Sequence, residues 1–79
     1  MKKKYKYIAM VETTNGKYRE QFAEGRDGKS LTSSARWTDA RLRSSKKSAA
    51  EQASKMAAGF TKKEKAKPFV RVITFEDEI

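Results

Sequence analysis

Residues 23–30 read Ala-Glu-Gly-Arg-Asp-Gly-Lys-Ser and have the spacing most suggestive of chemistry in this chain. They follow the phosphate-binding P-loop pattern with Ala23 in place of its first glycine. In that pattern backbone N–H groups cradle phosphates, the position of Lys29 reaches the terminal phosphate oxygens, and the position of Ser30 holds Mg²⁺. Residues 31–34 do not resemble the start of a helix, which supplies much of the phosphate affinity. We interpret the segment as a glycine-rich turn.

The composition lacks the residue types that most other catalytic sites use. The chain has no His and no Cys, which excludes thiol catalysis, Ser-His-Asp triads and the usual zinc sites. The acidic residues Glu76, Asp77 and Glu78 are neighbours at a chain end, whereas a cation needs several converging oxygens. We therefore expect a non-enzymatic protein with no cofactor, no metal and no small-molecule substrate.

Basic residues and aromatic residues offer a different chemistry, the binding of polyanions. Nineteen Lys and Arg against ten Asp and Glu give a net charge of +9, which attracts nucleic acid at low salt. Aromatic rings beside cations can stack on the bases of single strands. Equally, Tyr and Trp can form the core of a small sheet while Lys keeps its edges soluble. The candidate binding residues are Lys4, Tyr5, Lys6, Tyr7, Arg36, Trp37, Arg41, Arg43, Lys46, Lys47, Lys62 and Lys63.

The nature of the partner stays open at this point. No helix-turn-helix, zinc-finger or RNP-type signature is present, so binding to DNA or RNA would use phosphates and shape more than base edges. The first hypothesis is a binding module that contacts nucleic acid, or a nucleic-acid-bound protein complex, through phosphate-binding Lys and Arg. The rival hypothesis is a protein inhibitor or assembly factor that places its hairpin edge and aromatic residues on an acidic surface of a host protein.

A β-hairpin is predicted to carry the first aromatic residues. Residues 5–13 and 18–23 are rich in aromatic and aliphatic types and read as strands. Asn15-Gly16 between them is the strongest short hairpin signal, because a type I′ turn needs positive φ at both central positions. The expected pairs are Thr13 with Tyr18, Val11 with Glu20, Ala9 with Phe22, and Glu12 with Arg19.

The middle of the chain is less regular. Residues 25–28 read as a loop, and residues 30–34 as either a flexible segment or a poor edge strand. Residues 35–43 are ambiguous: Trp37 and Thr38 favour a third strand, whereas residues 40–42 would also suit a helix.

One helix and a last strand complete the prediction. Residues 44–60 carry an alanine-rich stripe at helical spacing, with Ser44 or Ser45 as N-cap, although a capping box at residues 48–51 could start the helix one turn later. Gly59 fits a left-handed position after the helix end. After a charged linker at 61–67, residues 69–75 are apolar on both faces, which is typical of an interior strand.

These elements predict one small domain over residues 1–79, in which residues 1–4 and 76–79 are the ends expected to fray. The fold class is α+β: a mainly antiparallel sheet of three to four strands, in the order β-β-β-α-β, with one helix packed on one face. The apolar run at residues 8–11 is too short for a signal peptide, and no stretch approaches the length of a transmembrane helix. We expect a cytoplasmic protein that does not bind membranes.

The layout resembles small phage-encoded proteins that block host defence, including anti-CRISPR proteins. The pieces that carry this resemblance are the hairpin at 5–23, the Ser-Lys-Lys-Ser-Ala-Ala-Glu run at 45–51 and the apolar strand at 69–75. The resemblance implies a stoichiometric inhibitor acting in the host cytoplasm on a nucleic-acid-handling complex. Many such inhibitors are acidic and mimic DNA, and the charge of +9 departs from that pattern.

Overall fold

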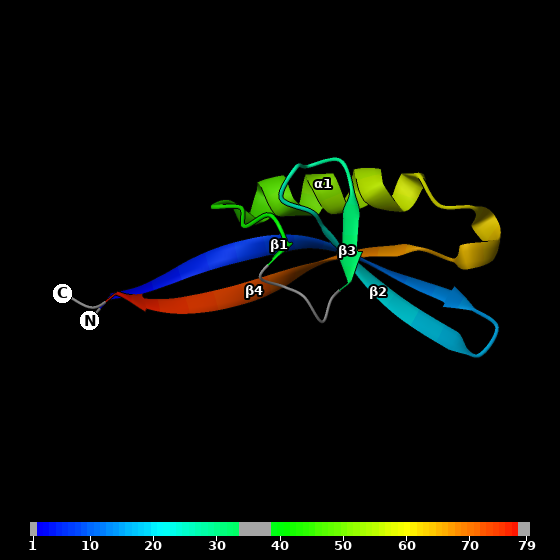
Figure 1. Cartoon of the computed structure of the whole chain (residues 1–79), viewed down its shortest axis with the longest axis horizontal. Helices are drawn as coiled ribbons and strands as arrows, with labels where there is room; N and C mark the ends of the chain where they lie inside the picture. Colours follow the sequence, from blue (N-terminus) through cyan, green and yellow to red (C-terminus); the bar gives the residue numbers. More distant parts are fainter. Residues whose placement is uncertain (1, 34–38, 78–79) are drawn as a thin grey trace.

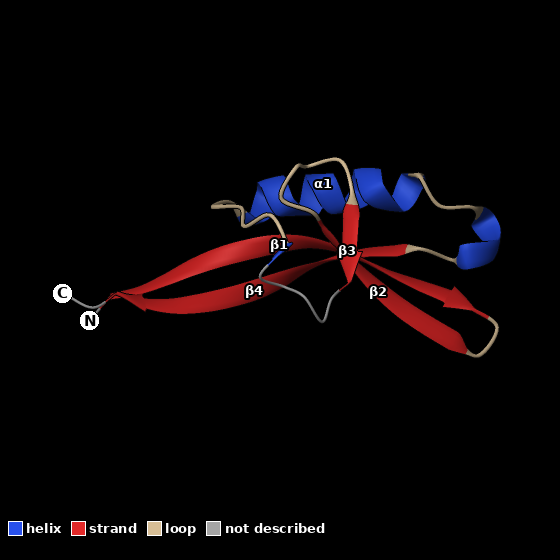
Figure 2. Cartoon of the chain, in the orientation of Figure 1, coloured by secondary structure: helices blue, strands red, loops and turns tan. Residues whose placement is uncertain are grey.

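Four strands form one antiparallel sheet in the order β3-β2-β1-β4, and one helix covers one of its faces (Figures 1 and 2). The computed structural model describes residues 2–33 and 39–77. The α+β expectation and the order β-β-β-α-β are confirmed, since the helix lies between β3 and β4 in the chain. The elements are β1 (Lys2–Asn15), β2 (Tyr18–Glu24), β3 (Leu31–Ser33), α1 (Lys46–Ala58), a 3₁₀ turn η2 (Lys62–Glu64) and β4 (Lys67–Asp77).

The hairpin of β1 and β2 is present, but its predicted register is wrong. Asn15 pairs with Tyr18, so the two turn residues are Gly16 and Lys17. Gly16 has φ +62 and Lys17 has no positive φ, which fits a type II′ turn with glycine at the first central position. The observed pairs are Val11 with Phe22, Thr13 with Glu20, Thr14 with Arg19, and Glu12 with Gln21 in place of Arg19.

The last strand is an edge strand, and the prediction of an interior position is wrong. β4 pairs only with β1 among the described strands, and β1 is the interior strand. Pro68 suits an edge because it has no N–H to donate to a second partner. Both faces of β4 are apolar because Pro68 and Val70 face α1 on one side, whereas Phe69 and Ile73 pack against the core cluster on the other.

The third strand is shorter and earlier than predicted. β3 is Leu31–Ser33, within the segment that was read as flexible or a poor edge strand. Residues 39–43 form neither the favoured strand nor the alternative helix; they make isolated bridges, Ala40 with Gly25 and Arg43 with Tyr7. The candidate residues Arg36 and Trp37 lie outside the described residues.

Helix α1 begins where the sequence indicated and ends slightly earlier. Ser45 is the N-cap, and its side chain accepts a hydrogen bond from the backbone N–H of Ser48 at 3.3 Å. Gly59 is the C-cap with φ −77, so the predicted left-handed conformation there is wrong. Instead the Gly59 N–H donates to the Met56 carbonyl at 3.1 Å, which closes the last turn.

The sheet is buried on both sides at the centre of β1. Towards α1, Ala49 and Ala53 are fully buried, and their small side chains let the helix lie close to the strands. Phe22 and Phe60 stack on this side with ring centroids 5.8 Å apart. On the far side the core cluster joins Ile8, Met10, Ala23 and Ala40, with Phe69 and Ile73 packed against it.

Candidate nucleic-acid interface

Strand alternation divides the four candidate residues of β1 between the two faces. Successive side chains of a strand point to opposite faces, so Tyr5 and Tyr7 lie on the side of α1 whereas Lys4 and Lys6 lie on the other side. Lys6 Nζ donates to Ser44 Oγ at 3.1 Å on that far side. The sequence prediction grouped these four residues, and the structure separates the aromatic residues from the lysines.

A short segment before α1 brings Arg41 and Arg43 to the aromatic side. Tyr7 and Arg43 exchange two backbone hydrogen bonds of 2.8 Å, and the Arg41 N–H donates to the Glu24 carbonyl at 2.8 Å. Residues 40–43 therefore run along the edge of β1 that β2 leaves unpaired before Met10. Because directly opposed residues share a face, Arg43 lies on the same side as Tyr7 and α1.

The guanidinium of Arg43 is engaged inside the fold. Its Nε and Nη2 donate to the two carboxylate oxygens of Glu24, each at 2.7 Å, and its Nη1 donates to Ser48 Oγ at 2.8 Å. The Glu24 side chain is 2% exposed, against 19% for Arg43. The hydrogen bonds to Glu24 raise the pKa of Arg43. This bidentate pair ties β2, the segment before the helix and α1 together, so Arg43 acts as a structural residue.

The turn at residues 25–30 is closed by its own carboxylate. Asp27 accepts hydrogen bonds from the backbone N–H groups of Lys29 and Ser30, each at 2.9 Å, and from Ser30 Oγ. The Ser30 N–H, then the Lys29 N–H and the Ser30 hydroxyl hold the pKa of Asp27 below its ordinary value. These two amides face Asp27, and the turn leads into β3 in place of a helix.

Arg41 lies against this turn. A Cβ placed on Gly28, which has φ +72, would be 2.9 Å from Arg41 Nη1 and 3.9 Å from a Glu24 carboxylate oxygen. Arg41 is nevertheless exposed. A shallow hollow extends from it to the helix start, lined by Arg41, Leu42, Arg43, Ser44, Ser45 and Ser48.

Lys46 and Lys47, here called the helix-start lysines, occupy the first turn of α1. Both are exposed, and the first turn contains no acidic residue. The helix dipole adds partial positive charge at this end. Two lysines there are unfavourable for the isolated helix, but together they create a strongly cationic point on the surface.

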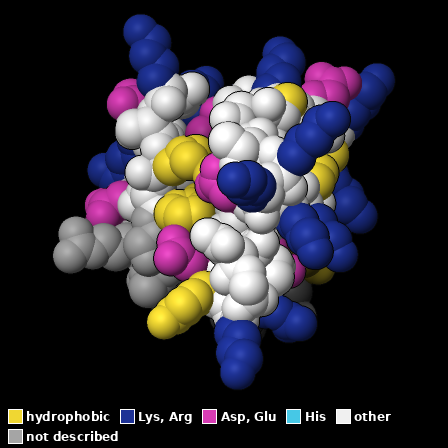
Figure 3. Space-filling view, turned by 90° about the vertical axis from the view of Figure 1, so that its right-hand side faces the viewer, with side chains coloured by type: hydrophobic (Ala, Val, Ile, Leu, Met, Phe, Trp, Pro, Cys, Tyr) yellow, Lys and Arg dark blue, Asp and Glu magenta, His cyan; other side chains and the backbone are white. Residues whose placement is uncertain are grey.

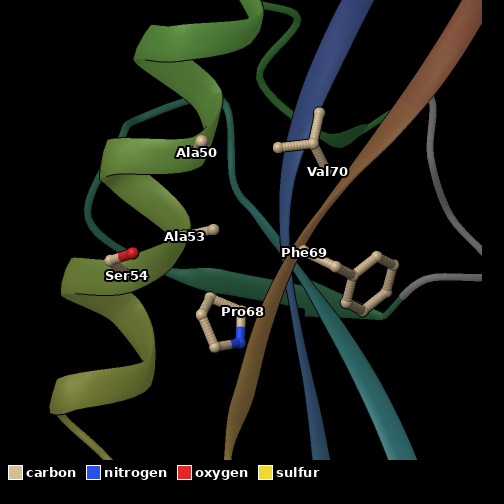
Figure 4. Close-up of a pocket in the computed structure, with 6 residues that line it drawn as sticks. All are labelled: Ala50, Ala53, Ser54, Pro68, Phe69 and Val70. Carbon is tan, nitrogen blue, oxygen red and sulfur yellow. The ribbon is translucent and has the colours of Figure 1, made fainter.

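A groove between α1 and β4 fixes where these lysines lie relative to the sheet. Ala50, Ala53 and Ser54 face Pro68 and Val70 across a cavity of about 130 Å³, while the Phe69 ring points to the other side of the strand (Figure 4). The helix runs antiparallel to β4. A step of one turn from Ala50 towards the helix start reaches Lys46, and a step of two residues in the same direction along β4 leads from Val70 to Val72. The rise of one helical turn matches that of two strand residues, at about 5–7 Å each. The first turn of α1 therefore lies at about the level of Val72 along β4.

Beyond the helix start, β1 and β4 continue as a two-stranded ribbon with an uncovered face (Figure 1). On the α1 side this face carries Tyr5, Tyr7 and Val72, here called the tyrosine platform. Tyr7 is opposite Val72, and Tyr5 is opposite Thr74. Tyr5 is 50% exposed and Val72 49% exposed, whereas Tyr7 is half-buried. The platform thus presents one aromatic ring and one aliphatic side chain to solvent on the side of the sheet that carries α1 and its helix-start lysines.

Lys62 and Lys63 lie at the opposite end of the helix. They belong to η2, whose N-terminus is closed by a capping box between Thr61 and Glu64. Helix α1 is 13 residues long and begins at Lys46, so its length of about 20 Å lies between the two pairs of lysines. Figure 3 views this end of the molecule, where Lys and Arg side chains project around the rim with acidic side chains between them. Lys62 and Lys63 therefore form a separate surface.

The described structure collects six of the twelve candidate residues on one side: Tyr5, Tyr7, Arg41, Arg43, Lys46 and Lys47. Val72 was missed as a site residue, although its place on the apolar strand and the alternation of that strand pointed to its face. Glu24 was missed as the partner of Arg43, and no local sequence signal connects two residues 19 positions apart.

Comparisons with protein-family models, with curated proteins and with solved structures found no match to this chain. Within residues 2–33 and 39–77, no helix has the length and apolar character needed to span a membrane.

Proposed function

We propose that this protein is a non-enzymatic nucleic-acid-binding module whose tyrosine platform and helix-start lysines hold a single strand. One observation carries the proposal: the exposed Tyr5 and Val72 are on the face of the sheet that α1 covers, and α1 begins with two exposed lysines and no acidic residue in its first turn. The ring of Tyr5 offers a surface on which a base can stack, and the lysines offer positive charge for the phosphate next to that base.

The energetics favour a single strand over a duplex. A base stacked on an aromatic side chain contributes about 1–3 kcal/mol, but only an unpaired base can expose its face to the ring. Lys46, Lys47 and Arg41 lie on the same side of the sheet and supply cations for backbone phosphates. Because stacking on a ring is open to every base and phosphate contacts carry no sequence information, we expect affinity with little sequence preference.

The salt dependence gives the proposal a quantitative form. Each phosphate contact to a single strand contributes about −0.7 to the slope of log K against log salt. Three contacts, from Arg41, Lys46 and Lys47, would weaken binding roughly 20-fold between 50 and 200 mM salt.

Fluorescence anisotropy with labelled single-stranded DNA and RNA and a matched duplex tests the proposal. The informative variant is Lys46→Glu with Lys47→Glu, which reverses the charge at the helix start. Its matched control is Lys62→Glu with Lys63→Glu, which makes the same change of charge at the other end of α1. We expect the first pair to lose most of the single-strand affinity and the second pair to lose little.

Two results would overturn the proposal. Equal losses in both pairs, or a larger loss in the control, would mean that the helix start is not the site. No binding of the wild-type protein at 50 mM salt would reject a nucleic-acid partner altogether. In that event an acidic surface of a host protein becomes the expected partner, as the resemblance to phage inhibitors implies.

A further inference from the structure

The outer edge of β4 is a long strand edge without a partner in the described part of the chain. It spans the eleven residues from Lys67 to Asp77, and Val72 at its midpoint is 49% exposed. The unpaired N–H and C=O groups of a long strand edge can form hydrogen bonds with another strand. Natural proteins either prevent this pairing or use it for association. We propose that this edge binds a second copy of the chain, forming a symmetric dimer with a continuous eight-stranded sheet.

Symmetry restricts how two such edges can pair. A two-fold axis perpendicular to the sheet keeps each residue on its own face, and directly opposed residues must share a face. The axis must therefore lie midway between one residue and the same residue of the second copy, so that this residue is opposite itself. An axis at Val72, the midpoint of the strand, gives the longest pairing of β4 with its copy, and only the hydrogen bond that Pro68 cannot donate is missing at each end.

The charges of the strand favour the axis at Val72. In this register Arg71 lies opposite Ile73, and the position of Lys67 lies opposite the position of Asp77. An axis at Arg71 would place two arginines opposite each other, and an axis at Ile73 would place Phe69 opposite the position of Asp77. Like charges in direct opposition destabilise a strand pair, so the midpoint register is also the complementary one.

The registers within each copy extend this complementarity across the sheet. Glu12 is opposite Lys67, and Lys2 is opposite Asp77. Joining two copies at Val72 therefore forms a row of backbone positions, Glu12, Lys67, Asp77 and Lys2, from one copy to the next, in which acidic and basic residue types alternate in sequence. The same row recurs on the other side of the axis, so both ends of the interface are matched.

The dimer would also change the surface on the helix side. Both copies of α1 lie on the same face of the continuous sheet, since the axis is perpendicular to it. At the centre the order across the sheet becomes Tyr7, Val72, Val72, Tyr7, which joins the two tyrosine platforms into one strip. The inference about the dimer goes beyond the proposed function and does not rest on it.

Sedimentation velocity on the free protein, without nucleic acid, tests self-association. We expect the wild-type protein to sediment as a dimer of the 9.0 kDa chain. Val72→Lys places two like charges at the axis and should weaken self-association by more than about tenfold. Gln21→Lys adds the same charge at an exposed position on β2 and should leave the dimer intact. A monomeric wild-type protein at millimolar concentration would overturn the proposal, as would equal effects of the two variants.

Cysteine cross-linking tests the register. The chain has no Cys, so a single Val72→Cys substitution introduces the one reactive thiol. Opposed residues of an antiparallel pair have Cα atoms about 4.5–5.5 Å apart, which suits a disulfide. Under mild oxidation Val72→Cys should give a covalent dimer, whereas Arg71→Cys, displaced from the axis, should give little. Efficient cross-linking of Arg71→Cys without that of Val72→Cys would reject the register.

Discussion

Two cationic regions meet at the start of α1 and differ in what surrounds their charges. Arg43 gives all three of its donating nitrogens to partners within the fold, Glu24 and Ser48. Lys46 and Lys47, three and four residues later, are exposed. The first region holds β2, the segment before the helix and the helix together, and the second is exposed on the side of the sheet that also carries the tyrosine platform.

The difference shows that a cluster of basic residues in sequence is not one surface. A charge opposite a buried carboxylate serves the fold, because an unpaired Glu24 would be costly inside the protein. The lysines on the first turn of the helix do not pair with a buried carboxylate of the described residues, so a role in the fold does not explain them. They lie on the same side of the sheet as an exposed ring. Variants that alter one region at a time separate these roles when each is compared with a control in the other region or at a neutral site.

The largest effect is expected from removing the partner of Glu24. Arg43→Ala leaves a nearly fully buried carboxylate without its two charge-assisted hydrogen bonds, which costs about 3 kcal/mol of the free energy of unfolding. Urea denaturation followed by circular dichroism measures the loss. Arg71→Ala, which removes an exposed arginine from β4, should change the free energy of unfolding by less than about 0.5 kcal/mol. Equal losses in the two variants would contradict a special role for the pair.

A smaller effect, on binding and not on stability, is expected from the platform. Tyr5→Ala removes the exposed ring and should weaken single-strand binding by about 1–2 kcal/mol, the contribution of one stacked base. Tyr5→Phe keeps the ring and should bind nearly as the wild-type protein does. Tyr18→Ala is the matched control, because Tyr18 is 78% exposed at the distant hairpin tip. Anisotropy titrations compare the three variants, and a loss in Tyr18→Ala equal to that in Tyr5→Ala would remove the platform from the site.

Local signals in the sequence predicted the elements better than their partners. The hairpin, the N-cap at Ser45 and the apolar last strand are present as expected. The register of the hairpin was wrong by two positions, because Asn15-Gly16 and Gly16-Lys17 both make acceptable two-residue turns. Since side chains alternate with a period of two, this error left every residue on its predicted face.

Long-range placement could not be obtained from the same signals. The edge position of β4 depends on which strand pairs with β1, and the apolar pattern of β4 is equally suited to an interior strand. The split between Tyr5 and Lys6 was available from strand alternation alone. The pairing of Arg43 with Glu24 could not be obtained in this way, because Glu24 lies on β2 and comes close to Arg43 only in the folded chain.

The N-cap of α1 links the two regions, and its removal should have a moderate effect. Ser45→Ala removes the side-chain acceptor of the Ser48 N–H, which costs about 1 kcal/mol of the free energy of unfolding. Ser54→Ala, at an exposed position within α1, should have no cost because alanine is the better helix former. Thermal denaturation of both variants measures the difference. A stability loss in Ser54→Ala as large as that in Ser45→Ala would contradict the capping role.

The smallest effect is expected at the turn that carries the P-loop-like residues. Because hydrogen bonds from Ser30 and Lys29 lower the pKa of Asp27 in the folded state, its ionised form stabilises the fold at pH values above the unfolded pKa of about 3.9. This contribution is lost as the pH falls through the lower folded value. Carboxyl chemical shifts of Asp27 followed by NMR should titrate below the ordinary pKa, and Ser30→Ala should bring the titration back part of the way by removing the hydroxyl donor. An Asp27 carboxyl that titrates at the ordinary value in both proteins would contradict the closed turn.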